Sequence, residues 1–179
     1  MKKFRKCIFE TNSSSTHSIT IANNLSDDFK NNLPDELVFD AGEYGWEFKR
    51  YQSVKDRADY LFTAILYCEL CDEYLPKIKE ILAKWGVKAV FPELIKKYYD
   101  NCWRYTLASD EYNDYDSYYI DHGDNLKDFL AKVCNDETLL MNYLFSDESF
   151  ISTGNDNTER ELDCNTNANN ILFEYYKTN

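Results

Sequence analysis

The sequence predicts an α+β fold, with a small mixed or antiparallel sheet from both chain ends and a central helical block. Short runs of alternating apolar residues indicate strands near both termini. From residue 53 the apolar residues recur at spacings of three and four, which is the period of a helix. With 179 residues, 44% of them hydrophobic, the chain can bury a core. We therefore expect a single domain, residues 1–179, in three portions: N-terminal strands (1–52), the helical block (53–107) and a strand–helix–strand portion that completes the sheet (108–179).

The N-terminal portion holds the first predicted strands. Residues 4–9 and 17–21 are apolar runs joined by the polar stretch TNSSST, which predicts a β-hairpin. Side chains of equal parity in the second run should share one face of the sheet: His17, Ile19 and Ile21. Residues 36–48 are expected to form a strand that leads into a loop with two glycines.

The middle of the chain is predicted to be helical. Ser53 is a suitable N-cap for a long helix over 53–74. A second helix should begin near Pro76 and end at Gly86, because glycine commonly follows a helix C-terminus. Residues 87–91 look like a short strand or linker, and Pro92 should open a third helix that reaches Trp103.

The last portion alternates strand and helix patterns. Residues 117–123 indicate a strand whose one face carries Tyr118, Ile120 and His122. An amphipathic helix over 124–136 and an almost entirely apolar helix over 137–147 should follow. Residues 148–157 predict a strand and a Gly-Asn-Asp-Asn turn, and 170–177 a final strand or short helix.

The charge is strongly negative, −12 at pH 7 with a pI near 4.6. The electrostatic field of so negative a protein disfavours direct binding to nucleic acid or to an acidic membrane surface, and it attracts basic partners. It leaves two interpretations open, solubility alone or binding to a basic protein that itself handles nucleic acid. No signal peptide or run of 18 apolar residues is visible, so we expect a soluble cytoplasmic protein with six reduced cysteines.

Two motifs suggest known chemistry but fit it poorly. Cys68 and Cys71 have the spacing of metal ligands, yet no second ligand pair follows, so we expect no metal or cofactor. We place both cysteines in the middle of a helix, where they would pack as small apolar groups. Residues 159–161, Glu-Arg-Glu, resemble part of an ADP-ribosyltransferase site, but Arg5 lies too close to the serine motif for that architecture.

Three polar motifs are predicted to converge: SSSTH, DHGDN and TGNDN. His17 and His122 share parity with isoleucines, so each should point inward at a strand end and find a hydroxyl or carboxylate partner. A structural junction is the simplest interpretation. A catalytic site with a serine nucleophile, a histidine base and an aspartate remains the alternative, although no nucleophile elbow or P-loop supports it. Its candidate residues are Ser13, Ser15, His17, Asp121, His122 and Asp156.

The stretch SDEYNDYDSYYIDHGD, residues 109–124, is called the acidic segment below; it contains no Lys or Arg. Carboxylates spaced along an exposed chain can imitate a phosphate backbone in front of a basic groove, and tyrosines among them add contact area. The alternative is a solvated acidic loop. The residues expected to bind a partner are Asp110, Glu111, Tyr112, Asp114, Tyr115, Asp116 and Tyr118.

The stretch FETNSSSTHS, residues 9–18, resembles the N-terminus of a largely uncharacterised group of small proteins from phages and related mobile elements, chiefly of Firmicutes. YIDHGDN and ISTGNDN are similar to further recurring stretches of that group. A phage origin implies antagonism of host defence as a natural role. Small acidic phage proteins of this kind look like anti-CRISPR inhibitors, which block the basic nucleic-acid channel of Cas9-type nucleases.

Charge and resemblance together favour a non-enzymatic inhibitor that binds a basic host protein, with a type II CRISPR effector and its guide RNA as the expected partner. Two other functions remain open. One is a small hydrolase or nuclease that acts on nucleic acid or a nucleotide signal through the Ser/His/Asp residues. The other is an accessory or structural protein of the phage.

Overall fold

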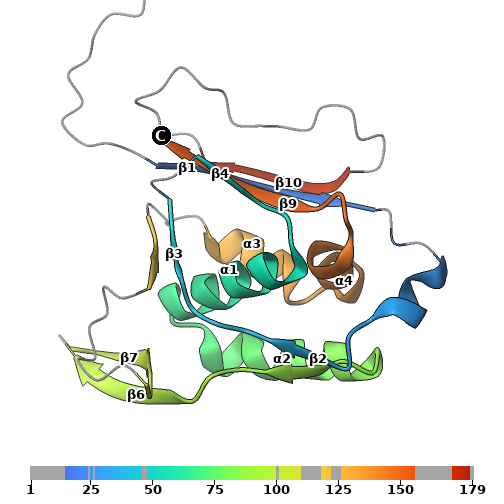
Figure 1. The fold of residues 1–179 in the computed structure, drawn as a ribbon. Helices are drawn as coiled ribbons and strands as arrows, with labels where there is room; N and C mark the ends of the chain where they lie inside the picture. Colours follow the sequence, from blue (N-terminus) through green and yellow to red (C-terminus); the bar gives the residue numbers. More distant parts are fainter. Residues whose placement is uncertain are drawn as a thin grey trace, which may run out of the picture.

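A computed structural model gives the structure, and it describes residues 15–23, 25, 27–45, 48–99, 101–109, 118–121, 126–155 and 171–177. The ribbon is layered (Figure 1). A four-stranded sheet lies on one side and helices α1 (Val54–Tyr67), α3 (Leu126–Val133) and α4 (Glu137–Phe145) lie beneath it. Helix α2 (Cys71–Lys84) and the parallel pair of β2 (Glu36–Val38) with β5 (Lys88–Val90) lie on the far side of these helices. The predicted α+β class is confirmed.

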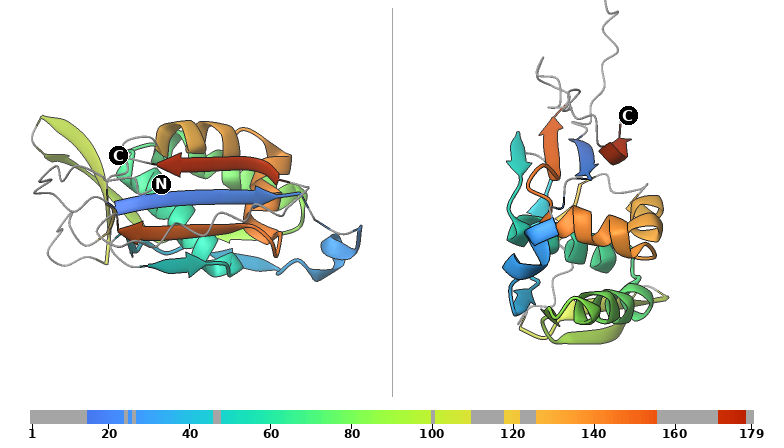
Figure 2. Two further views of the ribbon diagram at one scale, coloured as in Figure 1. Left: turned by 90° about the horizontal axis from the view of Figure 1, so that it is seen from above. Right: turned by 90° about the vertical axis from the view of Figure 1, so that its right-hand side faces the viewer.

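The sheet joins strands from the two halves of the chain. Its order is β10 (Ile171–Lys177), β1 (Ser15–Ala22), β9 (Phe150–Asn155) and β4 (Lys49–Tyr51), and every pairing is antiparallel (Figure 2). Ile19 lies opposite Ile151 on one side and opposite Tyr175 on the other. The strand predicted over 17–21 is therefore β1, one of the two inner strands of this sheet. The predicted strand over 4–9 lies outside the described residues.

Helix α1 begins where the sequence places it. Ser53 is its N-cap, and the Ser53 hydroxyl and the Asp56 carboxylate form a reciprocal capping box. Apolar side chains of α1 then pack against the inner face of the sheet and against α4, and burying one such side chain contributes about 1.5–3 kcal/mol. The core formed in this way includes Ile19, Ile151, Leu61, Ile65 and Leu144.

The prediction of one helix over 53–74 is wrong, because the chain turns between α1 and α2. Cys68 ends α1, and Glu69 follows with a φ of 60°. The amides of Glu69 and Leu70 donate to the carbonyls of Leu66 and Ile65, each at 3.0 Å, which is the pattern of a Schellman motif. This position usually holds glycine. The sequence offers no glycine there, and so no signal of the break.

The predicted third helix over 92–103 is also wrong, because these residues form a β-hairpin. Strand β6 (Leu94–Tyr99) pairs antiparallel with β7 (Cys102–Leu107), and Asn101 turns the chain with a φ of 65°. Asparagine is one of the few residues that tolerate this conformation. The run is rich in aromatic residues that favour strands. This hairpin extends from the helices at one end of the molecule (Figures 1 and 2).

Two further short strands position the candidate site. Strand β8 (Tyr119–Ile120) pairs in parallel with β3 (Glu43–Tyr44), which lies between the two glycines of the loop predicted at the end of residues 36–48. A short 3₁₀ helix covers Asp27–Asn32. Within the described part of the chain, no helix is long and apolar enough to cross a membrane.

Candidate functional site

His17 is held inside the protein. It lies on the inner face of β1 with 2% of its surface exposed. The hydroxyl of Tyr60, a fully buried residue of α1, lies 3.2 Å from its Nδ1 atom, within hydrogen-bond distance. The Tyr60 ring in turn meets the edge of the Tyr44 ring at 5.0 Å between centroids. A buried histidine locked by a neighbouring hydroxyl has the geometry of a structural residue.

The backbone brings two of the three predicted polar motifs side by side. Ser15 at the start of β1 lies opposite Asn155 at the end of β9, so the chain around SSSTH and the chain around TGNDN adjoin. Of the third motif the structure describes Asp121, whose amide donates to the carbonyl of Tyr44 at 2.8 Å. The remaining candidates of this junction, Ser13, His122 and Asp156, lie outside the described residues.

Sequence reasoning missed the buried arginine of α1. Arg57 donates to the carbonyl of Leu144, at 2.7 Å, and to that of Ser149, while the Tyr143 hydroxyl donates to the carbonyl of Arg57 at 2.8 Å. Burial lowers the pKa of the Arg57 guanidinium. Arg57 thus joins α1 to the end of α4 and the start of β9. Its place on the apolar stripe of α1, four residues before Leu61, is the signal that could have revealed it.

The cysteine pair does not sit in the middle of a helix as predicted. Cys68 caps the end of α1 and Cys71 begins α2. Burial raises the pKa of the Cys68 thiol to about 11 and that of the Cys71 thiol to about 12. Both thiols therefore stay protonated at neutral pH, unlike the thiolates that bind metals or exchange disulfides. Among the residues that the structure describes, no three His, Cys, Asp or Glu side chains are grouped to hold a metal ion.

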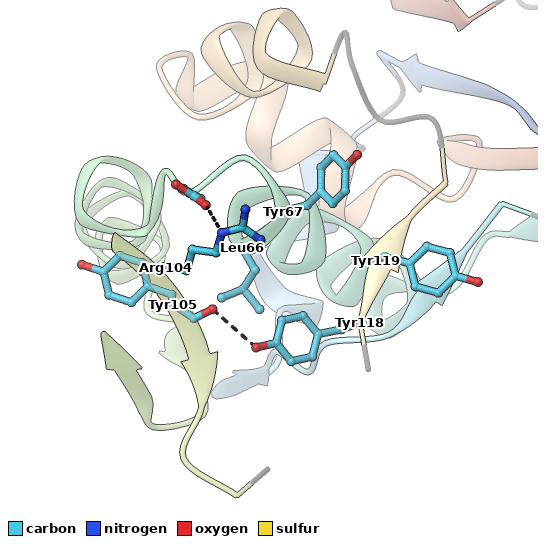
Figure 3. Close-up of a pocket in the computed structure, with 7 residues that line it drawn as sticks. Leu66, Tyr67, Arg104, Tyr105, Tyr118 and Tyr119 are labelled. Atoms are coloured by element: carbon cyan, nitrogen blue, oxygen red, sulfur yellow. Dashed lines mark hydrogen bonds and ion pairs between the residues drawn. The ribbon is translucent and has the colours of Figure 1, made fainter. Parts of the chain in front are cut away.

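Two pockets flank the short strand β8. The first has a volume of about 390 Å³ and opens between the end of α1, strand β7 and β8 (Figure 3). Inside it, Arg104 Nε lies 3.3 Å from a carboxylate oxygen of Glu69, and the Tyr118 hydroxyl donates to the carbonyl of Tyr105 at 3.4 Å. It is lined by Leu66, Tyr67, Glu69, Arg104, Tyr105, Tyr118 and Tyr119.

The second pocket, of about 280 Å³, lies at the pairing of β3 with β8. Tyr44 and Tyr51 meet edge to face there at 5.1 Å, and the ammonium of Lys49 lies 4.5 Å from the centre of the Tyr51 ring. Tyr119 lines both pockets, so the two are neighbours. The full lining is Gly42, Glu43, Tyr44, Gly45, Lys49, Tyr51, Asp56 and Tyr119. We call these two cavities the tyrosine pockets.

The β6–β7 hairpin presents two large aromatic side chains to solvent. Tyr98 is 61% exposed and Trp103 58% exposed, and their rings form a T-shaped pair at 5.3 Å. Lys96 makes an ion pair with Asp72 of α2 at 2.7 Å, and the Tyr105 hydroxyl donates to the same carboxylate. The hairpin is therefore anchored at its base and bears an aromatic pair toward its turn.

The predicted partner-binding residues are only partly described. Residues 110–117 lie outside the described part of the chain, and with them Asp110, Glu111, Tyr112, Asp114, Tyr115 and Asp116. Tyr118 is buried and forms a wall of the first tyrosine pocket. Strand β7 ends at Leu107, so the acidic segment begins immediately after the hairpin and returns to the body at β8.

Comparison of the chain with protein-family models, with curated proteins and with solved structures gives no significant match.

Proposed function

We propose that this protein is a phage-encoded inhibitor that acts in the cytoplasm of the bacterial host. It binds the basic nucleic-acid-binding surface of a Cas9-type effector that carries its guide RNA. The observation that carries the proposal is the exposed Tyr98–Trp103 pair, on a hairpin whose second strand runs into the acidic segment. Tryptophan and tyrosine are the residues most enriched at the energetic centres of protein interfaces. The carboxylates that follow supply the charge that a basic groove attracts.

The charge of the hairpin itself does not oppose this role. Lys96 is paired with Asp72, and Arg104 is paired with Glu69. Two of the three cations of the hairpin strands are therefore accompanied by a carboxylate from outside the hairpin, and the net charge of −12 dominates at a distance. Electrostatic attraction would speed encounter with a basic partner, and the aromatic pair would slow its release.

The test measures binding and inhibition with a purified Cas9-type effector loaded with guide RNA. Trp103→Ala removes an exposed ring, so it should leave stability nearly unchanged while weakening binding by about 30-fold, the equivalent of a 2 kcal/mol interface residue. Phe48→Ala is the matched control, because Phe48 is an exposed aromatic residue outside the hairpin.

Charge reversal tests the second element of the surface. Replacing Asp110, Glu111, Asp114 and Asp116 together by lysine should abolish binding and restore DNA cleavage. Binding of the unaltered protein should also weaken as salt is raised from 50 to 500 mM, because salt screens exposed charges. Full inhibition by the charge-reversed protein would refute the proposal, as would wild-type binding that is indifferent to salt.

A further inference from the structure

We propose that the tyrosine pockets bind arginine side chains of the basic partner, and that Tyr119 forms a wall of both pockets. This inference rests on the proposed function, since it names the chemistry that the partner must present. It assigns the specific contact to the described end of the acidic segment, Tyr118 and Tyr119, and to the residues that line the pockets with them.

The geometry of β8 places aromatic rings on both sides of one strand. Tyr119 is the first residue of β8 and Tyr118 precedes it, and the two rings point in opposite directions (Figure 3). Tyr118 faces Tyr105 and the end of α1, and Tyr119 reaches the rim where the second pocket begins. With volumes of about 390 and 280 Å³, the pockets far exceed the ~30 Å³ share of one water molecule. Each therefore has room for a planar guanidinium group and part of its alkyl stem.

The second pocket already contains a cation of this chain. The Lys49 ammonium lies 4.5 Å from the centre of the Tyr51 ring, within the ~6 Å range of a cation–π contact. The Tyr51 ring thus already presents one face to a positive charge. Guanidinium is the better fit for neighbouring rings, because it is planar, stacks on aromatic faces and is less strongly hydrated than ammonium.

The charged groups of the second pocket favour a cation over an anion, because the carboxylates of Glu43 and Asp56 line it together with one lysine, Lys49. In the first pocket Glu69 already lies 3.3 Å from Arg104, so an entering guanidinium would contact the tyrosine rings there. Burial raises the pKa of Tyr119, and the negative charges of Glu43 and Asp121 raise it further.

The acidic segment connects the hairpin to the pockets, so a partner that binds this segment would lie close to them. The acidic segment leaves the hairpin after β7 and enters the body at Tyr118, a wall of the first pocket. A basic groove of the partner that binds the acidic segment would therefore contact the hairpin at one end and the tyrosine pockets at the other. Arginine side chains of that groove would meet the tyrosine rings and carboxylates of the pockets.

The experiment is an NMR titration of the full chain, observed through tyrosine ring resonances, with N-acetyl-arginine methylamide as the probe and AMP as an anionic aromatic probe. The arginine probe should shift Tyr119 and its neighbours, with millimolar affinity. Tyr119→Ala should weaken this binding at least tenfold and Tyr119→Phe should preserve it, because the ring face rather than the hydroxyl makes the contact. Tyr98→Ala, on the hairpin, should change nothing.

A second variant keeps the test interpretable if Tyr119→Ala does not fold. Tyr67 is 43% exposed at the first pocket, so Tyr67→Ala should keep the fold and lose the shifts of that pocket alone. Shifts with AMP but not with arginine would overturn the inference, and so would arginine shifts unaffected by both variants. If the arginine probe fails while the effector still binds, this inference is wrong and the proposed function stands. If the probe binds but no effector does, the proposed function is wrong instead.

Discussion

Replacing Tyr60 by phenylalanine tests whether His17 is a structural residue. The hydroxyl of Tyr60 lies 3.2 Å from His17 Nδ1, and both side chains are buried. Phenylalanine keeps the ring and its edge contact with Tyr44, and the change removes the hydroxyl that lies within hydrogen-bond distance of His17. Loss of a hydrogen bond inside a protein costs about 1–3 kcal/mol when the partner stays buried. We expect the free energy of unfolding to fall by about 2 kcal/mol, and Tm by about 4–8 °C for a chain of this size.

The assay is urea unfolding followed by circular dichroism, with a calorimetric Tm as the second measurement. The urea midpoint should fall while the slope m stays constant, because the fold is unchanged. Tyr98→Phe is the matched control, since Tyr98 is mostly exposed and should alter stability by less than about 0.5 kcal/mol. If Tyr60→Phe unfolds within 0.5 kcal/mol of the wild type, this contact does not hold His17 in place and the structural interpretation fails.

Three further predictions concern local structure and pH. Ser53→Ala removes the side-chain half of the α1 capping box and should cost about 1 kcal/mol, which urea unfolding would detect; Ser53→Asp should retain most of the stability. Gly86→Ala should cost about 1 kcal/mol through backbone strain alone, because Gly86 has a φ of 78° and no atom would contact the added methyl; an unchanged urea midpoint would contradict this. Burial raises the pKa of the Cys134 thiol from 9.0 to about 12, so above pH 9 the unfolded thiol loses its proton while the folded one keeps it, and stability must fall as pH rises from 9 toward 12. Cys134→Ala should flatten that decline by up to about 1.4 kcal/mol per pH unit, and equal slopes in urea unfolding at pH 8 to 10.5 would count against it.

The features that the sequence predicts correctly are those with local causes. The start of α1 depends on a serine and an aspartate three residues apart, which together satisfy the free amides of a helix end. The face of β1 that meets the helices follows from parity, since alternate residues of a strand point to the same side. Ile19 and Ile21 belong to the core and His17 meets Tyr60 of α1, although Ser18 and Thr20 of the other parity are buried as well. Such signals can be read within a few residues.

The errors come from segments whose local pattern allows two structures. Leu94, Ile95 and Tyr98 fit a helical stripe as well as a strand, and pairing across the turn at Asn101 decides for the hairpin. At Glu69 a left-handed residue ends α1 without the glycine that usually marks this turn. Packing of α2 against the rest of the chain compensates for that local cost.

The candidate site shows the same division. The sequence by itself determined the acidic charge, the strand that carries His17, the helix from Ser53 and the mixture of strand and helix. Only the tertiary structure decided that Arg57 is buried against carbonyls from residues 144 and 149, and that Tyr67, Tyr105 and Tyr119 surround one pocket. The physical reason is distance along the chain: periodicity and capping act within one or two turns, whereas these contacts join residues from tens of positions to more than eighty positions apart.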